Sequence, residues 1–369
     1  MLGIPMTEKN NTPEEGEEAL LGLVTDLLNH WLHVMSLFDQ AQIQMADHPS
    51  LAEALLPPSA SLRAAHLALT KASAATEGPI RELLDGAEYS LRACDGISHH
   101  EEGFGPVMKA MRAHCRAQEA CLPLSQFMSP VNRYFLDKTA SENATILAEV
   151  EAKTGNPDRG LFSMDNNRNS RGGFSAFIPE RLLPNPPLII ALHGGTGHGA
   201  DFIWSWVRES RSRGFIVIAP TSSGDTWSMI DDNDTDLPVL LTLVEQIGSR
   251  FDVDIEHILL TGMSDGATYS LLAGLRENSP FTHLAPFSGV FHPDIMMSGN
   301  LQYASRKPVY LVHGTNDWMF PVDAAHMTND TLVAAGADVT LRIIDGLSHT
   351  YARGENRALL EWFDPCLAT

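Results

Sequence analysis

Two patterns of hydrophobic positions divide the chain into two parts. Residues 17–154 carry apolar side chains at mixed three- and four-residue intervals, which is the spacing of helices that bury one face. The predicted helices span residues 17–45, 51–56, 61–73, 79–94, 106–122 and 141–153, with breaks at proline and glycine, Pro57-Pro58 among them. We therefore expect an all-helical domain over residues 1–154, with its polar residues 1–16 disordered.

From residue 155 onward, short runs of apolar residues alternate with helical patterns. Strands are predicted at residues 160–164, 173–178, 188–192, 215–219, 257–261, 283–287, 309–312 and 339–344, and helices near 200–212, 237–251, 265–275, 322–335 and 354–362. The first two strands flank a turn-rich segment and are typical of a β-hairpin. Continuously apolar strands that alternate with helices indicate a mostly parallel sheet with helices on both faces. We expect an α/β domain over residues 155–369.

Composition and charge narrow the classes of partner. The 369 residues include 25 basic and 46 acidic side chains, and the net charge of −21 disfavours nucleic acid and anionic membrane surfaces. No apolar stretch reaches the ~18 residues that a membrane span needs, so we expect no membrane insertion. Residues 1–20 lack the basic-then-apolar pattern of an export signal, and we expect a cytoplasmic protein.

The spacing of cysteine and histidine gives no indication of a metal centre. The chain has four irregularly spaced cysteines, Cys94, Cys115, Cys121 and Cys366. This spacing is typical of reduced thiols rather than of a disulfide framework. The His-His-Glu-Glu segment at 99–102 and the His114-Cys115 pair lack the paired spacing of a zinc site. We predict no bound metal.

The sequence Gly-Met-Ser-Asp-Gly at residues 262–266 is the strongest indication of chemistry. A Gly-x-Ser-x-Gly match alone is more often an ordinary turn. Here it follows the strand predicted at 257–261 and opens the helix predicted at 265–275, which is the setting of a nucleophile elbow. The Ser264 hydroxyl then stands at the carboxyl edge of the sheet, next to a helix N-terminus that favours developing negative charge.

A nucleophilic serine needs a base that is oriented by a carboxylate. Asp317 comes shortly after the strand predicted at 309–312, and His349 comes shortly after the strand predicted at 339–344. The order Ser, Asp, His is the one expected for this architecture, and the carboxyl ends of parallel strands are where such sheets build their sites. We predict Ser264, Asp317 and His349 as the catalytic residues.

Other carboxylates and imidazoles lie close by in the sequence and compete for these roles. They are Asp323, Asp345, His313 and His326. Asp323 is expected to begin a helix, and Asp345 is only four residues from His349. His313 ends a strand, where packing or a local hydrogen bond is the simpler explanation.

A glycine-rich segment, His-Gly-Gly-Thr-Gly at 193–197, follows the strand predicted at 188–192. Acyl-transfer chemistry needs backbone N–H groups at such a place to bind the oxyanion. We predict the N–H of Gly195, or alternatively that of Thr196, as one donor and the N–H of Asp265 as the other. The acidic run at 231–236 is sufficiently explained as an N-terminal cap of the following helix. It lacks the glycine and the closing glutamate of a calcium-binding EF-hand loop.

Taken together, these motifs resemble the α/β-hydrolase superfamily of serine esterases over about residues 155–367. The segments at 193–197, 262–266, 313–321 (HGTNDWMFP) and 346–349 (GLSH) are similar to those of carboxylesterase/phospholipase-type and polyhydroxybutyrate-depolymerase-like esterases. The resemblance implies hydrolysis of a small-molecule carboxylic ester through an acyl-enzyme, without a cofactor. Ser264 would attack the carbonyl, His349 would move the proton, and Asp317 would orient the imidazole.

The chain departs from the family pattern around the substrate pocket. Only residues 288–307 separate the sixth and seventh predicted strands, which leaves no room for a substantial cap. We expect the helical domain to act as a lid or to mediate a homodimer. Residues expected near the pocket mouth suggest an apolar acyl or aryl pocket, although each alone is more often a packing residue: Trp227, Met229, Phe291, Trp318, Phe320 and Tyr351.

Several functions share these motifs. The interpretation we favour is a hydrolase of short-to-medium acyl or aryl esters. A feruloyl-type esterase or a thioesterase stays open, and a serine peptidase or amidase is disfavoured because no residue evidently grips a peptide terminus. A non-catalytic binding protein with the same fold would lack turnover of p-nitrophenyl esters.

Overall fold

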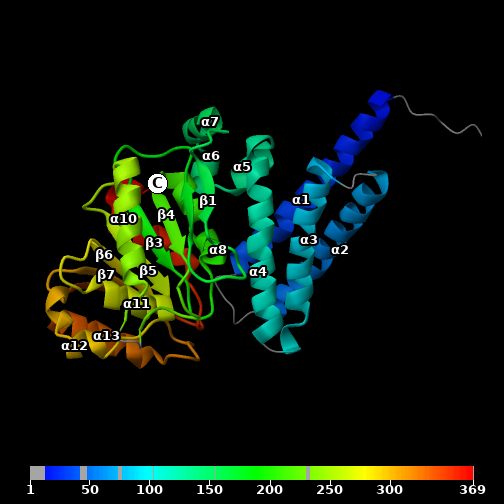
Figure 1. Cartoon of the computed structure of the whole chain (residues 1–369). Helices are drawn as coiled ribbons and strands as arrows, with labels where there is room; N and C mark the ends of the chain where they lie inside the picture. Colours follow the sequence, from blue (N-terminus) through cyan, green and yellow to red (C-terminus); the bar gives the residue numbers. More distant parts are fainter. Residues whose placement is uncertain are drawn as a thin grey trace, which may run out of the picture. The chain divides into compact units, whose positions relative to one another are not determined.

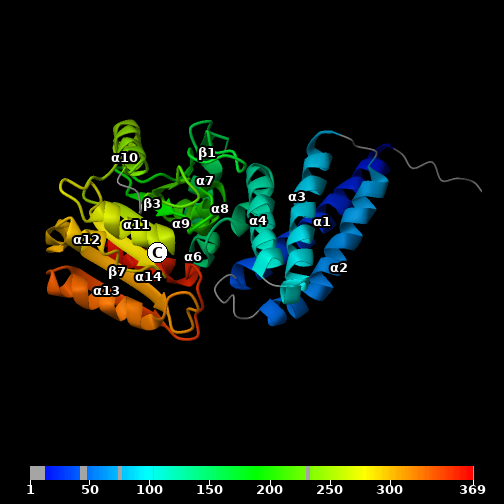
Figure 2. The same cartoon turned by 60° about the horizontal axis from the view of Figure 1, so that its bottom comes forward.

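The computed structural model describes residues 13–41, 48–73, 77–102, 104–153, 155–229 and 233–368. The chain forms two compact units, which are both drawn in Figures 1 and 2. The helical unit ends at Pro123, and the unit that contains the sheet continues from Leu124. The predicted division lies between residues 154 and 155, whereas in the structure residues 124–153 belong with the sheet.

The helical unit is built from four long helices that lie side by side (Figure 1). They are α1 (Pro13–Ala41), α2 (His48–Ala72), α3 (Pro79–Ser98) and α4 (Phe104–Cys121). Helices α1 and α3 approach closely at Gly86, where a Cβ atom would lie 2.5 Å from the ring of Trp31. Helix α1 begins inside the segment that was expected to be disordered, and the rest of that segment, residues 1–12, lies outside the described residues.

The predicted break at Pro57-Pro58 is wrong, because α2 continues through both prolines. Each proline removes a backbone donor and crowds the preceding turn of a helix. Leu55, Leu62 and Leu69 of the same helix are almost completely buried. Burial of that apolar face, at roughly 1.5–3 kcal/mol for each leucine, outweighs the local cost of the prolines.

The second unit contains one eight-stranded sheet in the order β1-β2-β4-β3-β5-β6-β7-β8. Its strands are β1 (Gly160–Met164), β2 (Phe174–Ile178), β3 (Leu188–Leu192), β4 (Ile216–Pro220), β5 (Ile258–Met263), β6 (His283–Phe287), β7 (Pro308–Gly314) and β8 (Asp338–Ile344). Strand β2 runs antiparallel to both β1 and β4, and all the other pairs are parallel. The predicted hairpin and the mostly parallel sheet are therefore confirmed, and this is the α/β-hydrolase fold.

Helices cover both faces of the sheet. They are α8 (Gly199–Phe202), α9 (Val207–Arg213), α10 (Leu237–Phe251), α11 (Asp265–Gly274), α12 (Asp294–Met297), α13 (Val322–Ala334) and α14 (Asn356–Phe363). Side chains of α10, α11 and α13 share one apolar cluster with Leu188, Ile190 and Leu192 of β3. Because side chains of a strand alternate in direction, Ile189 and Ala191 of β3 face the opposite layer, where both are completely buried. The sheet is thus buried on both sides, as its continuous apolar strands predict.

Three short helices before β1 belong to this unit: α5 (Ser129–Tyr134), α6 (Lys138–Glu142) and α7 (Ala144–Lys153). Arg211 of α9 is completely buried and donates to the backbone and side-chain oxygens of Asn132 at 2.9 and 2.7 Å. Its guanidinium also pairs with Glu180 at 2.9 Å. A buried charge is tolerated only when it is paired and hydrogen-bonded, so this cluster fastens α5 to the sheet layer.

Candidate active site

Ser264 is the single residue between β5 and α11, and its backbone is strained. Its φ of 57° and ψ of −118° are values that side-chain-bearing residues rarely adopt. Hydrogen bonds hold it there, because the Ser264 N–H donates to Phe287 O at 2.9 Å and the Thr268 N–H donates to Ser264 O at 3.0 Å. The sharp turn that the motif predicts is therefore present.

Both glycines of the motif are required by close approach of the backbone. A Cβ atom on Gly262 would lie 2.5 Å from the carbonyl of Gly266. A Cβ atom on Gly266 would lie 2.5 Å from the carbonyl oxygens of Leu192 and His193. Neither backbone segment can move aside without disturbing β3 or α11. The glycines thus let the elbow sit against the loop that follows β3.

Replacing Gly266 by alanine is expected to destabilise the protein by about 1–3 kcal/mol, because the methyl group meets fixed backbone oxygens. Gly248, in the interior of α10, is the matched control, since nothing lies within 4 Å of its added Cβ. Gly248→Ala should instead stabilise by up to about 1 kcal/mol. Urea unfolding of both variants measures the effects, and equal stability of Gly266→Ala and wild type would contradict the expectation.

The structure brings the three predicted catalytic residues together, and all three are buried. His349 Nε2 lies 3.0 Å from Ser264 Oγ, and His349 Nδ1 lies 2.8 Å from Asp317 Oδ2. A carboxylate only accepts hydrogen bonds, so Nδ1 carries the proton and donates to Asp317. Nε2 is then left with a lone pair and accepts from the Ser264 hydroxyl. This arrangement can remove a proton from the serine.

The Asp317 carboxylate is itself fixed by the turn that follows β7. Its Oδ1 accepts from the N–H groups of Met319 and Phe320 at 2.9 and 2.8 Å. Its Oδ2 faces His349, and His313 Nε2 lies 3.4 Å from the same oxygen. His313 also bonds locally, because its Nε2 lies 2.9 Å from the carbonyl oxygen of Phe320. Each carboxylate oxygen thus has a distinct set of partners.

Three of the four competing residues are exposed, and the fourth, His313, is buried beside Asp317. His326 and Asp323 are exposed on α13. Asp345 is exposed and accepts from the Thr315 hydroxyl at 3.2 Å. His313 is completely buried and makes the local hydrogen bond that the sequence suggested.

The glycine-rich loop after β3 lies beside the nucleophile. A Cβ atom on Gly194 would be 3.4 Å from the Ser264 Cβ. The Gly197 N–H donates to Gly194 O at 2.9 Å, which closes a tight turn, and the Thr196 N–H donates to Asp225 O at 2.8 Å. Thr196, the alternative oxyanion donor, therefore has its N–H engaged in this structure.

The other two predicted donors are in a different situation. No backbone oxygen of the described residues accepts from the Gly195 N–H. Asp265 is the first residue of α11, and a first-turn N–H has no partner within its helix. The Asp265 carboxylate accepts from the Thr226 hydroxyl at 2.6 Å and lies against Gly195, 2.6 Å from where its Cβ would be. Thr226 thus positions Asp265, a contact that no local sequence pattern predicts.

His193 holds the loop from inside in a single tautomer. Its Nδ1 donates to Gly194 O at 2.7 Å, and its Nε2 accepts from the Ser222 N–H at 3.1 Å. The Trp227 indole N–H donates to the carbonyl oxygen of His193 at 2.8 Å. Burial lowers the pKa of His193 to about 4. A proton on Nε2 would face the Ser222 N–H, so the neutral form is the one that fits.

The stability of the protein should fall as pH drops from about 6.5 to about 4. An unfolded histidine, with a pKa near 6.5, binds a proton in this range while folded His193 does not. The loss from this residue is about 3 kcal/mol, fully expressed below pH 4. Burial lowers the pKa of His283 to about 4 as well, which adds to the same loss.

Urea unfolding at pH 7, 6, 5 and 4 measures this dependence. His193→Asn should flatten the curve in part, because His283 still titrates in the same range. His326→Asn, at an exposed position on α13, is the control and should leave the curve unchanged. A wild-type curve that is flat between pH 6.5 and 4 would contradict the assignment of a neutral, buried His193.

The aromatic residues expected near the pocket mouth differ in their exposure. Trp227 and Tyr351 are buried, and each has its polar atom occupied, Trp227 by His193 and Tyr351 by Asn356 at 2.8 Å. Phe291 is half-buried against the hydrophobic core. Trp318 is 66 % exposed, and its ring lies 5.8 Å from that of His349. Trp318 is therefore the member of the group placed to meet a substrate.

Phe320 lies equally close to the site, with its ring 5.4 Å from that of His349.

The acidic run is structural where it is described; residues 231 and 232 lie outside the described part. Asp234 Oδ1 accepts from the N–H groups of Asp236 and Leu237 at 3.2 and 3.0 Å, at the start of α10. Both oxygens of Asp236 accept from the loop after β4, from the N–H groups of Ser223 and Ser228 at 2.8 Å each. Asp236 thus shapes the loop after β4, which contains Asp225.

Within the described ranges, no group of three or more His, Cys, Asp or Glu side chains could hold a metal ion. The helices in those ranges also include none that is both long and apolar enough to cross a bilayer.

Comparisons with known proteins relate the second part of the chain to ester hydrolases. The sequence profile of the phospholipase/carboxylesterase family matches residues 226–366. A bifunctional acetylxylan esterase/xylanase from Neocallimastix patriciarum is 27% identical over 146 residues, which are 38% of this chain and 21% of that protein. Acetylxylan esterase A from Aspergillus awamori is 26% identical over 128 residues, which are 32% of this chain and 42% of that protein. The chain therefore spans less than half the length of these relatives.

A solved structure of acetyl xylan esterase from Aspergillus awamori is also similar, with a TM-score of 0.45 and 17% identity over 55% of this chain and 98% of that one. The predicted resemblance to carboxylesterase/phospholipase-type esterases is confirmed. The relatives named above are carboxylic ester hydrolases.

Proposed function

We propose that this protein hydrolyses carboxylic esters with short-to-medium acyl or aryl groups through a Ser264 acyl-enzyme. The observation that carries the proposal is the continuous hydrogen-bonded series from Ser264 Oγ through His349 to Asp317, with distances of 3.0 and 2.8 Å. Such a series is the requirement for activating a serine hydroxyl near neutral pH. The ester hydrolases among its relatives support the reaction class.

In the first half of the reaction, Ser264 Oγ attacks the ester carbonyl carbon while His349 Nε2 takes the hydroxyl proton. Asp317 keeps the proton on Nδ1 and stabilises the imidazolium that forms. The carbonyl oxygen becomes an oxyanion next to the loop after β3 and the start of α11. The N–H groups of Gly195 and Asp265 would donate to it, and the loss of one such donor typically costs about 10²–10³ in turnover.

The imidazolium then returns its proton to the departing alcohol, which completes the first half and leaves an acyl group on Ser264. In the second half, a water molecule gives a proton to the same Nε2 and attacks this acyl group, and the imidazolium then protonates Ser264 Oγ as the bond to the acyl carbon breaks and the acid is released. His349 accepts and returns the proton in both halves, and Asp317 is its paired carboxylate. The reaction therefore needs no cofactor to move its protons.

A second candidate is an esterase that removes acyl groups from carbohydrates. Two observations favour it: the relatives named above are acetylxylan esterases, and the exposed Trp318 ring lies 5.8 Å from the His349 ring. An exposed aromatic ring offers a flat apolar face to a sugar or an aryl group. Feruloyl-type esters combine both groups and belong to the same candidate.

A panel of substrates tests these proposals. We expect hydrolysis of p-nitrophenyl acetate and butyrate, weaker hydrolysis of long acyl chains, and no cleavage of the matching p-nitroanilides. Acetate release from acetylated xylan, or ferulate release from methyl ferulate, at a higher kcat/KM than p-nitrophenyl acetate would favour the second candidate. The absence of turnover with every ester would refute both and favour a binding protein with this fold.

We further propose that the protein is cytoplasmic and forms a homodimer through the helical unit. We propose no nucleic-acid partner and no insertion into a membrane. The mass of the full chain by light scattering tests the oligomer, and a monomer across the working concentration range would refute it.

A further inference from the structure

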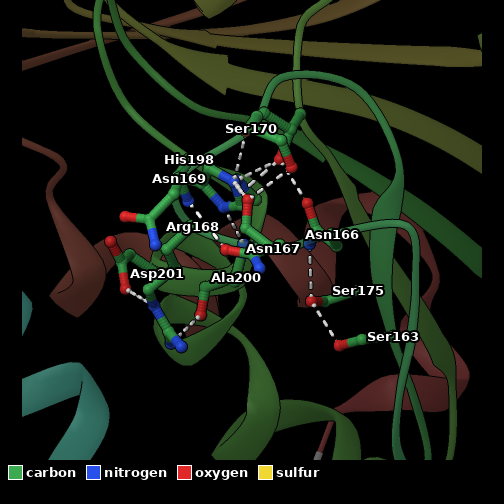
Figure 3. Close-up of polar contacts among 12 residues, drawn as sticks. Ser163, Asn166, Asn167, Arg168, Asn169, Ser170, Ser175, His198, Ala200 and Asp201 are labelled. Carbon is green, nitrogen blue, oxygen red and sulfur yellow. Dashed lines mark hydrogen bonds and ion pairs between the residues drawn. The ribbon is translucent and has the colours of Figure 1, made fainter.

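The turn that joins β1 to β2, residues 165–172, packs against the loops after β3 and β4. The Gly172 N–H donates to Ser222 O at 3.1 Å, in the loop after β4. On the other side, His198 Nε2 lies 3.2 and 3.3 Å from the carbonyl oxygens of Asn167 and Ser170, as Figure 3 shows. This turn is thus fixed at the edge of the candidate site.

Arg171 of this turn contacts both loops with one guanidinium. Its Nη1 donates to Gly197 O and its Nε donates to Gly224 O, each at 2.7 Å, and its Nη2 donates to the Ser222 hydroxyl. Burial lowers the pKa of Arg171, although a guanidinium stays charged at any working pH. Hydrogen bonds from a charged donor are short and strong, so three of them in a planar fork fix the relative position of the two loops.

The loop held by Arg171 is the one that carries the Gly195 N–H. Gly197, whose carbonyl oxygen accepts from Arg171, also closes the tight turn by donating to Gly194 O. The opposite side of the turn is tied by the Thr196 N–H to Asp225 O. Asp225 adjoins Gly224, the second residue that Arg171 holds. Gly195 therefore lies between two constraints, and Arg171 acts on both.

Arg168 lies in the same turn but serves a different part of the fold. Its Nε donates to Asp201 Oδ1 at 2.8 Å and its Nη2 donates to Ala200 O at 3.1 Å, both in α8 (Figure 3). These contacts of Arg168 thus hold the turn to a helix, whereas those of Arg171 hold the loop beside Ser264. Arg168 thus anchors the turn, and Arg171 orients the glycine-rich loop after β3.

We propose that Arg171 is a positioning residue for ester hydrolysis, which sets the orientation of the Gly195 N–H toward the developing oxyanion. The inference rests on the proposed function, because this N–H has a catalytic task only if an acyl group is transferred to Ser264. An oxyanion donor acts on the transition state more than on the bound ester. Arg171 should therefore influence kcat and leave KM nearly unchanged.

The test uses the full chain with p-nitrophenyl acetate. Arg171→Met should lower kcat by about 10- to 100-fold, since a misplacement of about 1 Å can cost that much. KM should change by less than about threefold, and the midpoint of the kcat/KM pH profile, which reports His349, should not move. Arg171→Lys keeps the charge without the planar fork, so it should recover only part of kcat and also serves if the methionine variant does not fold.

Arg168→Met is the control and should keep kcat within about twofold of wild type, because it leaves the contacts of the glycine-rich loop after β3 unchanged. Unchanged kcat in both Arg171 variants, a rise in KM at constant kcat, or an equal loss of kcat in Arg168→Met would overturn the inference while leaving ester hydrolysis intact. A wild-type protein that turns over no ester would instead refute the proposed function, and the role of Arg171 with it.

Discussion

Ser264→Ala is expected to lower kcat for p-nitrophenyl acetate by about 10⁴- to 10⁶-fold, because it removes the atom that would form the acyl-enzyme. The variant should also lose labelling by a fluorophosphonate, which reacts with an activated serine. Folding should be little affected, since the substitution removes one hydroxyl and keeps the strained backbone of the elbow. The two assays therefore report on chemistry rather than on stability.

Ser270→Ala provides the matched control for this variant. Ser270 lies in the same helix, α11, and its buried hydroxyl donates to Ala267 O at 2.7 Å. Its removal should leave both turnover and labelling at the wild-type level. Full activity in Ser264→Ala, or persistent labelling, would refute the proposed nucleophile and with it the acyl-enzyme mechanism.

Asp317→Asn should lower kcat by about 10⁴-fold, through the tautomer of His349. Oδ1 of Asp317 receives the N–H groups of Met319 and Phe320, so the amide oxygen of asparagine must occupy that position. The amide NH₂ group then faces His349 Nδ1 and makes it an acceptor. Nε2 would carry the proton and could no longer accept one from Ser264.

Asp345→Asn is the control, because Asp345 is the carboxylate closest to His349 in the sequence among the competitors. It is exposed and accepts a hydrogen bond from the Thr315 hydroxyl, away from the triad, so kcat should stay at the wild-type level. A loss of less than about tenfold in Asp317→Asn would show that another group orients the imidazole. His313, 3.4 Å from the same oxygen, would then be the first residue to examine.

The centre of the sheet could be predicted because β3 and β4 are apolar and buried at every position, where a charged side chain would be costly. Each predicted strand from 188–192 onward overlaps an observed one, including β8, which carries Arg342 and is only partly buried. The ends of the helices in residues 17–154 could not be predicted equally well. Pro57 and Pro58 signal a break locally, and only the burial of Leu55, Leu62 and Leu69 in the folded unit keeps α2 continuous.

In the candidate site, residues that belong to a motif could be predicted and residues that act through contacts could not. Ser264 stands in a spaced glycine motif between a strand and a helix, and Asp317 and His349 each follow a strand. Arg171 lies 26 positions before Gly197 and 53 before Gly224, and no local pattern links it to them. Only the antiparallel pairing of β2 with β4 brings this turn to the loops.

Aromatic residues near the mouth illustrate the same limit. Trp227 and Trp318 are equally plausible substrate contacts in the sequence. In the fold, the indole N–H of Trp227 is bonded to His193 O inside the core, whereas Trp318 is exposed. The exposure of a large side chain depends on how neighbouring loops fold over it, and a single sequence does not encode that in any local signal.

The buried cluster of Arg211, Glu180 and Asn132 has a consequence for how this architecture can change over evolutionary time. A chain that lost α5 would leave a charged guanidinium inside the protein without two of its acceptors, so residues 124–153 cannot be traded independently of the sheet. The four long helices that precede Leu124 carry no part of this cluster. Any replacement of the helices before Leu124 would therefore have to keep α5 with the sheet, because Asn132 supplies two of the acceptors of Arg211.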